Sequence, residues 1–165
     1  MNKIFLYTDG ACRGNQDTNN VGAWAYCLVF GESAENTNAK HTKTDSGFAK
    51  NTTNNIMELT AVIKGLEALS NKTAYPILVY SDSKYVVEGI TNWYKNWQKN
   101  NWQRKEGTKW TDVKNKELWQ RLVNLKNQCT DINFIHVYGH SGIELNELVD
   151  KLCNTTIDNA QKQLS

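Results

Sequence analysis

The sequence has no apolar run near the length of a membrane span, no Cys-x-x-Cys pair, and no internal repeat or low-complexity segment. A membrane-spanning helix needs ~20 consecutive apolar residues, so we expect no membrane partner. The four cysteines are widely spaced, which argues against a zinc site or a disulfide framework and favours reduced, mostly buried thiols in an intracellular protein. No signal peptide precedes the first expected strand, so we expect a cytoplasmic location.

The overall composition is ordinary, but the charge is unevenly distributed. A length of 165 residues with 39% hydrophobic content predicts a single domain over residues 1–165, which we expect to act as a monomer. The net charge is +2, yet residues 90–126 hold nine Lys or Arg against three Asp or Glu, together with five of the six tryptophans. A basic, aromatic segment on a mildly acidic body is typical of a surface that binds a polyanion.

Two apolar segments of the sequence each end in an aspartate. Residues 4–8 lead to Asp9, and residues 77–81 lead to Asp82. We expect each segment to be a buried strand that ends at its aspartate, with a polar turn over residues 10–20 after the first. A helical repeat between them implies a right-handed crossover, so the two strands are expected to be parallel neighbours whose carboxylates lie side by side.

Hydrophobic periodicity predicts the remaining elements. Residues 23–30 alternate large and small apolar side chains, as a strand does, and residues 39–50 are polar enough for a strand at a sheet edge. Apolar residues recur at helical spacing from Ile56 to Leu69, and Asn55 is the expected cap of this first helix. The later elements are a helix over 83–99 broken near Gly89, a loop over 100–115, a helix over 117–128, a strand over 132–137 and a helix over 144–161. The expected fold is α/β, with a mixed five-stranded sheet, three strands antiparallel and two parallel, flanked by helices on both faces.

Two further acids are expected near the paired aspartates. Glu58 lies near the start of the first helix, and Asp150 lies in the last helix. Carboxylates a few ångströms apart raise one another's pKa unless a cation neutralises them. Mg²⁺ prefers oxygen ligands and leaves positions open for phosphate oxygens, and two such ions can stabilise both oxygens of an in-line phosphoryl displacement. The pattern therefore favours metal-dependent chemistry on a nucleic-acid backbone.

Each of these residues, taken alone, has a structural alternative. Asp9 could cap a turn, Glu58 could be the capping-box partner of Asn55, and Asp82 could cap the helix that follows it. Asp150 could be a solvated surface acid, and His140 an ordinary residue of a Gly-His-Ser-Gly turn. The residues one by one leave these alternatives open, whereas their joint pattern favours one shared site.

Five motifs, taken in order, resemble type 1 ribonuclease H. They are Tyr7-Thr8-Asp9-Gly10-Ala11, Asn54-Asn55-Ile56-Met57-Glu58-Leu59, Ser81-Asp82-Ser83-Lys84-Tyr85-Val86, Gly89-Ile90-Thr91-Asn92-Trp93 and Val137-Tyr138-Gly139-His140-Ser141-Gly142. The resemblance implies a ribonuclease H-like fold and an endonuclease that hydrolyses the RNA strand of RNA–DNA hybrids, leaving 5′-phosphate and 3′-hydroxyl ends. It also implies catalysis with two Mg²⁺ ions, for which Mn²⁺ can substitute, and a role in removing RNA primers and R-loops.

The resemblance implies roles for individual residues. Asp9, Glu58, Asp82 and Asp150 match the metal-binding carboxylates, and His140 matches a mobile histidine that assists proton transfer or product release. The positions that match hybrid-binding residues are Asn15, Asn54 and Asn55 for the backbone and minor groove, Thr53 and Asn115 for a DNA-strand phosphate, Tyr85 and Trp93 for the DNA sugars, and Trp97, Lys99, Trp102 and Lys105 in a basic protrusion that grips the DNA strand.

Three other classes of function compete with this hypothesis. A hybrid-binding domain without catalysis would not need all four carboxylates. A phosphotransferase of the haloacid-dehalogenase type, with Asp9 as nucleophile, would carry a second acid where Ala11 stands. A 3′-exonuclease on a related sheet would begin with Asp-x-Glu, which is also missing here.

Overall fold

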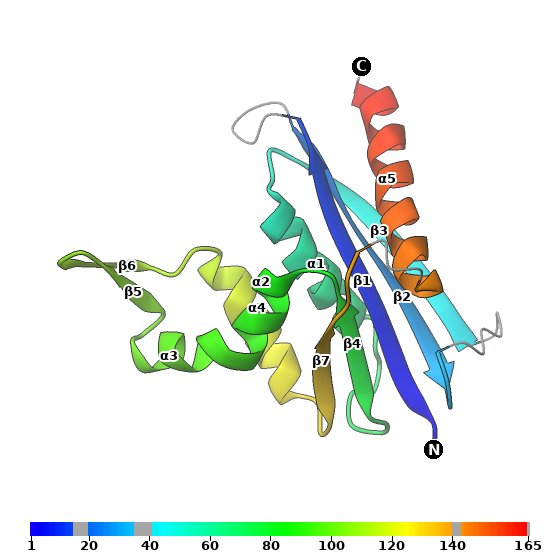
Figure 1. Cartoon of the computed structure of the whole chain (residues 1–165), viewed down its shortest axis with the longest axis horizontal. Coiled ribbons are helices and arrows are strands. Elements are labelled where there is room, and N and C mark those ends of the chain that lie inside the picture. Colours follow the sequence, from blue (N-terminus) through cyan, green and yellow to red (C-terminus); the bar gives the residue numbers. More distant parts are fainter. Residues whose placement is uncertain (15–19, 35–40, 140–142, 165) are drawn as a thin grey trace.

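A computed structural model describes residues 1–14, 20–34, 41–139 and 143–164, and its main feature is one mixed sheet (Figure 1). The sheet has five strands in the order β3-β2-β1-β4-β7. They are β1 (Lys3–Arg13), β2 (Val21–Gly31), β3 (Thr42–Lys50), β4 (Ile77–Ser81) and β7 (Ile132–His136). β2 is antiparallel to both β1 and β3, whereas β4 is parallel to both β1 and β7. The predicted sheet, with its polar edge strand β3, is confirmed.

Helices cover both faces of this sheet (Figure 1). They are α1 (Asn54–Glu67), α2 (Lys84–Glu88), the π-helical turn η2 (Gly89–Trp93), α3 (Tyr94–Lys99), α4 (Lys116–Asn127) and α5 (Glu144–Leu164). In β2, Tyr26 and Leu28 contribute to the core with α1 and α4, whereas Ala25 and Cys27 contribute to the core with α5. The predicted alternation of large and small side chains is therefore confirmed. No helix in the described part of the chain is both long enough and apolar enough to cross a membrane.

β1 extends further than its sequence predicts. We expected the strand to end at Asp9, but it continues to Arg13, which pairs with Val21 of β2. The pairing with β4 stops earlier, at Thr8 and Ser81. The expectation was wrong because β2 continues to pair with residues 10–13, beyond Asp9. Asp9 thus lies within β1, just beyond the end of β4.

The loop expected over residues 100–115 contains a hairpin instead. Its strands are β5 (Gln103–Glu106) and β6 (Lys109–Asp112), which pair only with each other. The hairpin extends with α3 away from the main sheet (Figure 1). Its residues are mostly exposed, so they lack the alternation of apolar and polar residues by which a strand is recognised. Gly107, with φ of 63°, takes the left-handed conformation that its turn requires.

Helix ends gave one confirmed and one wrong prediction. The break near Gly89 is confirmed, because η2 begins there. The cap of α1 is Thr53, whose hydroxyl accepts from the Ile56 amide at 3.1 Å, so the assignment of the cap to Asn55 is wrong. All four cysteines, each in a described segment, are free thiols, as predicted, and Cys27 and Cys153 are buried.

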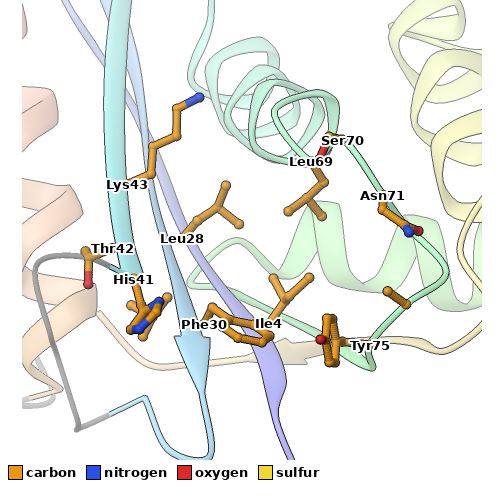
Figure 2. A pocket seen from close by; sticks show the side chains of 12 residues that line it. Ile4, Leu28, Phe30, His41, Thr42, Lys43, Leu69, Ser70, Asn71 and Tyr75 are labelled. Carbon is orange, nitrogen blue, oxygen red and sulfur yellow. The ribbon is translucent and has the colours of Figure 1, made fainter.

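A hollow of about 440 Å³ lies where β1 begins and α1 has ended (Figure 2). Ile4, Leu28 and Leu69 line it with Phe30, which contacts Tyr75 edge to face at 4.7 Å. None of its described lining residues is acidic. The carboxylates gather instead toward the other end of the sheet.

Candidate active site

Asp9 and Asp82 are neighbours because two parallel strands bring them to the same point. β1 and β4 pair as far as Thr8 and Ser81, and each aspartate is the next residue. The Thr8 hydroxyl donates to the Tyr80 carbonyl at 3.1 Å and ties the strands together just before the site. Asp9 is only 4% exposed, so its carboxyl group is largely removed from water.

Glu58 reaches the same point from the first turns of α1. The helix lies directly on β1 at Gly10, where an added Cβ would be 2.4 Å from the Glu58 nitrogen. The Glu58 side chain is buried, and its Oε1 has no hydrogen-bond partner among the described residues. A buried carboxylate oxygen without a partner is costly, so this oxygen needs a proton or a cation.

These three carboxyl groups form one cluster. Asp9, Glu58 and Asp82 each offer an oxygen atom within 4.8 Å of those of the other two. Burial, the charge of Asp82 and a hydrogen bond with Asp150 raise the pKa of Asp9 to about 8. Burial and the charges of Asp9 and Asp82 raise the pKa of Glu58 well above its ordinary value. The cluster therefore resists full ionisation at neutral pH unless a cation is bound.

Asp150 reaches the cluster from α5. It lines the same cleft, of about 340 Å³, as Asp9, Glu58 and Asp82. Its side chain interacts with that of Asp9, although it is not part of the group within 4.8 Å. The four carboxylates supply oxygen ligands to one cleft, and Glu58 Oε1 is buried without a partner among the described residues. This arrangement fits a hard divalent cation that keeps coordination positions open for phosphate oxygens.

The structural alternatives for two of the acids are not what the structure shows. Ser83, not Asp82, caps α2, because its hydroxyl accepts from the Val86 amide at 3.2 Å. Thr53 caps α1, so Glu58 is not three positions from the cap and completes no capping box. Both acids are left available for the cleft.

The candidate hybrid-binding residues fall into two groups, and the first lies around the acidic cleft. Asn54 and Asn55 form the exposed first turn of α1 and line this cleft. Thr53 lies just before them as the cap. Asn15 and His140 lie outside the described residues, so their predicted roles stay predictions.

The second group lines an aromatic hollow of about 360 Å³ beside α2, η2 and α3. The ring of Trp93 lies 6.1 Å from that of Tyr85 and 6.1 Å from that of Trp97, measured between centroids. The Tyr85 hydroxyl accepts from Asn115 Nδ2 at 3.1 Å and from Trp119 Nε1 at 2.9 Å. The structure thus connects the residues predicted for the sugar channel with Asn115, predicted for the phosphate pocket.

The basic protrusion carries its charge on the outside. Trp102 contacts Trp97 at 6.2 Å, between ring centroids, at the base of the protrusion. Lys99 in α3 and Lys105 in β5 are exposed, and neither is among the residues that line the aromatic hollow. Exposed lysines at this place can contact a backbone that passes over the hollow.

Comparison with known proteins decides the family. A sequence model of the family described as RNase H matches residues 1–158. A protein named Ribonuclease H from Clostridium botulinum (strain Hall) is 45% identical, covering 96% of this chain and 97% of that protein. Another of that name, from Acetivibrio thermocellus, is 42% identical over 99% of this chain and 100% of its own. The chain belongs to the ribonuclease H family. It is therefore a metal-dependent hydrolase with endonuclease function.

Solved structures place the chain among the type 1 members of the ribonuclease H family. The chain superimposes with a TM-score of 0.78 on "LC9-RNase H1, a type 1 RNase H with the type 2 active-site motif", at 28% identity over 94% of this chain and 72% of that one. It also matches the LC11-RNase H1 structure "in complex with RNA/DNA hybrid", with a TM-score of 0.67 at 25% identity over 96% and 99% of the two chains. The resemblance to type 1 ribonuclease H is confirmed.

Several residues around these two hollows were missed from the sequence. Gly10, Ala11 and Cys12 line the acidic cleft, and a glycine directly after a strand aspartate was the available signal for the close approach of α1. Arg104 and Lys114 line the aromatic hollow. They come from the hairpin and from the segment after it, so no local pattern could have placed them beside Trp93.

Proposed function

We propose that this member of the ribonuclease H family hydrolyses the RNA strand of RNA–DNA hybrids with two Mg²⁺ ions, for which Mn²⁺ can substitute. The observation that carries the proposal is the cluster of Asp9, Glu58 and Asp82, each of which offers an oxygen within 4.8 Å of those of the other two. Glu58 also has a buried oxygen, Oε1, that lacks a hydrogen-bond partner in the described part of the chain. These residues would hold the ions together with Asp150 from α5. Divalent ions held there would activate the attacking water and neutralise charge on the leaving 3′-oxygen, which would give products with 5′-phosphate and 3′-hydroxyl ends.

The protein's own groups would orient the substrate around this cluster. Asn54 and Asn55 line the acidic cleft with polar side chains that can contact the RNA strand, where 2′-hydroxyls distinguish RNA from DNA. The hollow with Tyr85 and Trp93 offers aromatic faces to the sugars of the DNA strand. His140 would assist proton transfer or product release, and Asn15 would bind the hybrid backbone.

We further infer that residues 1–165 act as one domain and as a monomer, and that the protein removes RNA primers and R-loops in the cytoplasm. One sheet joins the N-terminal and C-terminal halves of the described chain, which supports a single domain. Four free thiols are compatible with a reducing compartment.

Strand-labelled RNA–DNA, RNA–RNA and DNA–DNA duplexes test the proposal. We expect cleavage of the RNA strand of the hybrid alone, in Mg²⁺ but not in chelator. Asp9→Asn should lower the cleavage rate by about 10³-fold or more, because loss of a metal ligand removes several kcal/mol of transition-state stabilisation. Hybrid binding by that variant should persist, since the aromatic hollow and the protrusion are intact. Turnover by Asp9→Asn at the wild-type rate, or cleavage in chelator, would refute the metal assignment.

A further inference from the structure

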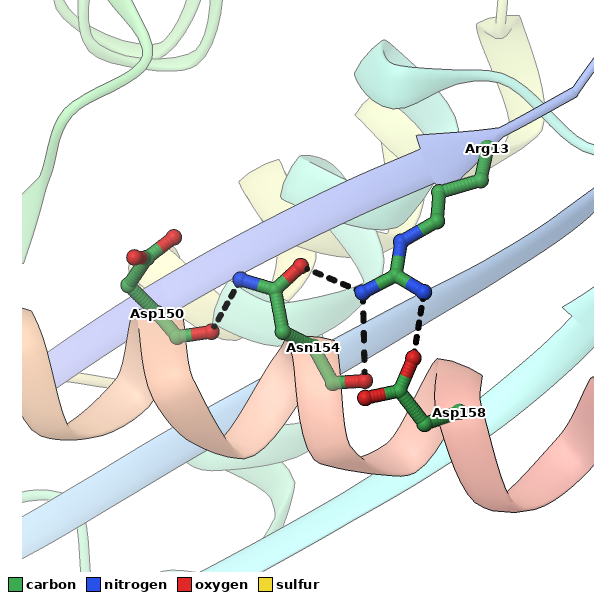
Figure 3. Close-up of polar contacts among 4 residues, drawn as sticks. All are labelled: Arg13, Asp150, Asn154 and Asp158. Atoms are coloured by element: carbon green, nitrogen blue, oxygen red, sulfur yellow. Dashed lines mark hydrogen bonds and ion pairs between the residues drawn. The ribbon is translucent and has the colours of Figure 1, made fainter.

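The guanidinium group of Arg13 links the end of β1 to α5 (Figure 3). Its Nη1 donates to Asp158 Oδ1 at 2.5 Å, and its Nη2 donates to the Asn154 side-chain oxygen at 2.9 Å and to the Asn154 carbonyl at 3.4 Å. Asn154 Nδ2 donates in turn to the backbone carbonyl of Asp150 at 3.0 Å. One cation thus holds two successive turns of α5, and the contacts continue to the turn that carries Asp150.

The spacing of these contacts matches the spacing of the carboxylates at the cleft. Asp150, Asn154 and Asp158 are each four residues apart, so they lie on one side of α5. Arg13 lies four residues beyond Asp9 in β1, a distance of about 13 Å along a strand. The eight residues from Asp150 to Asp158 span about 12 Å along a helix. The two contact points between β1 and α5 are therefore nearly the same distance apart along the strand as along the helix.

The two meeting points have opposite electrostatic character. Asp9 and Asp150 both line the acidic cleft, so one point of contact brings two carboxyl groups together. Arg13 brings a cation to the Asp158 carboxylate at the other point. Two ionised carboxylates repel each other, whereas the Arg13 contacts hold α5 against β1. A guanidinium fork suits this task because its two nitrogens fix direction as well as distance.

We propose that Arg13 is a positioning residue for Asp150: its fork onto Asn154 and Asp158 sets where α5 presents that carboxylate to the acidic cleft. The inference rests on the proposed metal role of Asp150. Arg13 itself acts through the helix, without contact to the ions or to the reacting phosphate. Replacing Arg13 therefore lowers the affinity for divalent ions, and it has no further effect on that affinity in a protein that already lacks Asp150.

Calorimetric titration of the substrate-free protein with Mg²⁺ tests this in Arg13→Ala, Asp150→Ala and the double variant. We expect Arg13→Ala to weaken Mg²⁺ binding by about tenfold, the lower range for residues that orient a ligand. The double variant should bind Mg²⁺ no more weakly than Asp150→Ala, because coupled residues are not additive. Arg13→Lys should recover only part of the loss, since an ammonium group cannot make the fork.

A matched control separates positioning from general support of α5. The Thr156 hydroxyl joins α5 to β3 through Ser46 Oγ at 2.8 Å, away from the cleft. Thr156→Ala should lower the Tm yet leave Mg²⁺ affinity at the wild-type value. Equal weakening of Mg²⁺ binding by Thr156→Ala and Arg13→Ala would overturn the proposal in favour of general support.

Wild-type Mg²⁺ affinity in Arg13→Ala would overturn the inference without touching the proposed function. If that variant also bound the hybrid more weakly and with less salt dependence, Arg13 would be assigned to a phosphate contact. If Asp150→Ala itself bound Mg²⁺ like the wild type, the proposed metal role of Asp150 would fail, and this inference with it.

Discussion

Gly10 is the residue that allows α1 to bring Glu58 beside Asp9. An added Cβ would lie 2.4 Å from both the Glu58 nitrogen and the Met57 carbonyl carbon. These are backbone atoms, so a change of side-chain rotamer cannot relieve the overlap. We expect Gly10→Ala to lower the free energy of unfolding by about 1–3 kcal/mol, the usual cost of overpacking. It should also slow Mg²⁺-dependent cleavage, because Glu58 would move from the cluster.

Urea unfolding and cleavage assays of Gly10→Ala measure these two effects. Gly31→Ala is the matched control, since the nearest atom to its added Cβ is 3.8 Å away and the position lies at the far end of β2. Gly31→Ala should change neither quantity appreciably. Similar behaviour of the two variants would show that the close approach at Gly10 does not position Glu58.

Single residues also show where sequence patterns are ambiguous. Asn55 and Thr53 are both good helix caps, and the choice between them depends on where the chain leaves β3. The structure selects Thr53, so Asn54 and Asn55 become the exposed first turn of α1. This shift leaves both amides free of a capping role at the edge of the acidic cleft.

At the scale of elements, the π-helical turn that follows α2 packs at Gly89 directly against Trp119 of α4. A Cβ at Gly89 would lie 2.0 Å from Trp119 Cη2, and Trp119 is fully buried. Gly89→Ala should therefore lower the free energy of unfolding by about 2–3 kcal/mol. It should also weaken hybrid binding, because Trp119 donates to the Tyr85 hydroxyl in the aromatic hollow.

Denaturant unfolding and hybrid titration test this prediction. Asn92→Ala is a suitable control in the same π-helical turn, because Asn92 is exposed and its side-chain amide donates to Glu88 Oε2 of the neighbouring turn at 2.8 Å. Its effect should stay within about 0.5 kcal/mol. A Gly89→Ala protein as stable as Asn92→Ala would mean that Trp119 repacks without cost.

The protrusion formed by α3 and the β5–β6 hairpin should supply salt-dependent affinity. Lys99→Gln and Lys105→Gln together remove two exposed charges, so the slope of log affinity against log salt should fall by about two. Lys3→Gln and Lys43→Gln form the control pair, because those lysines lie toward the end of the sheet that is far from the acidic cleft. Fluorescence titrations at several salt concentrations measure the slopes. Equal slopes for the two pairs would remove the protrusion from the hybrid-binding surface.

At the scale of the whole molecule, the acidic cluster should make stability depend on pH and on metal. Asp9 has a pKa of about 8 in the folded chain against 3.8 as its ordinary value, so between these values the unfolded state binds fewer protons than the native state. The free energy of unfolding of the metal-free protein should therefore fall as pH rises from about 4 to about 8. Glu58 acts in the same direction.

Urea unfolding at about pH 5 and about pH 8, in chelator and in Mg²⁺, measures this linkage. Mg²⁺ binds the ionised carboxylates, so its stabilising effect should be larger at the higher pH. Asp9→Asn removes one titrating group, so the free energy of unfolding of the metal-free variant should fall less steeply with pH than that of the wild type. Stability that rises with pH in chelator would contradict the proposed state of the cluster.

The amino-acid sequence alone was enough to predict the sheet, its two faces and the position of Asp9 beside Asp82. These follow from local periodicity and from the handedness of crossovers, which are properties of short segments. The folded chain was needed to show how far β1 runs, which residue caps α1 and that residues 103–112 form a hairpin. It was also needed to show that Arg13 reaches α5. Those features depend on particular hydrogen bonds and side-chain contacts, which leave no periodic signal in the sequence.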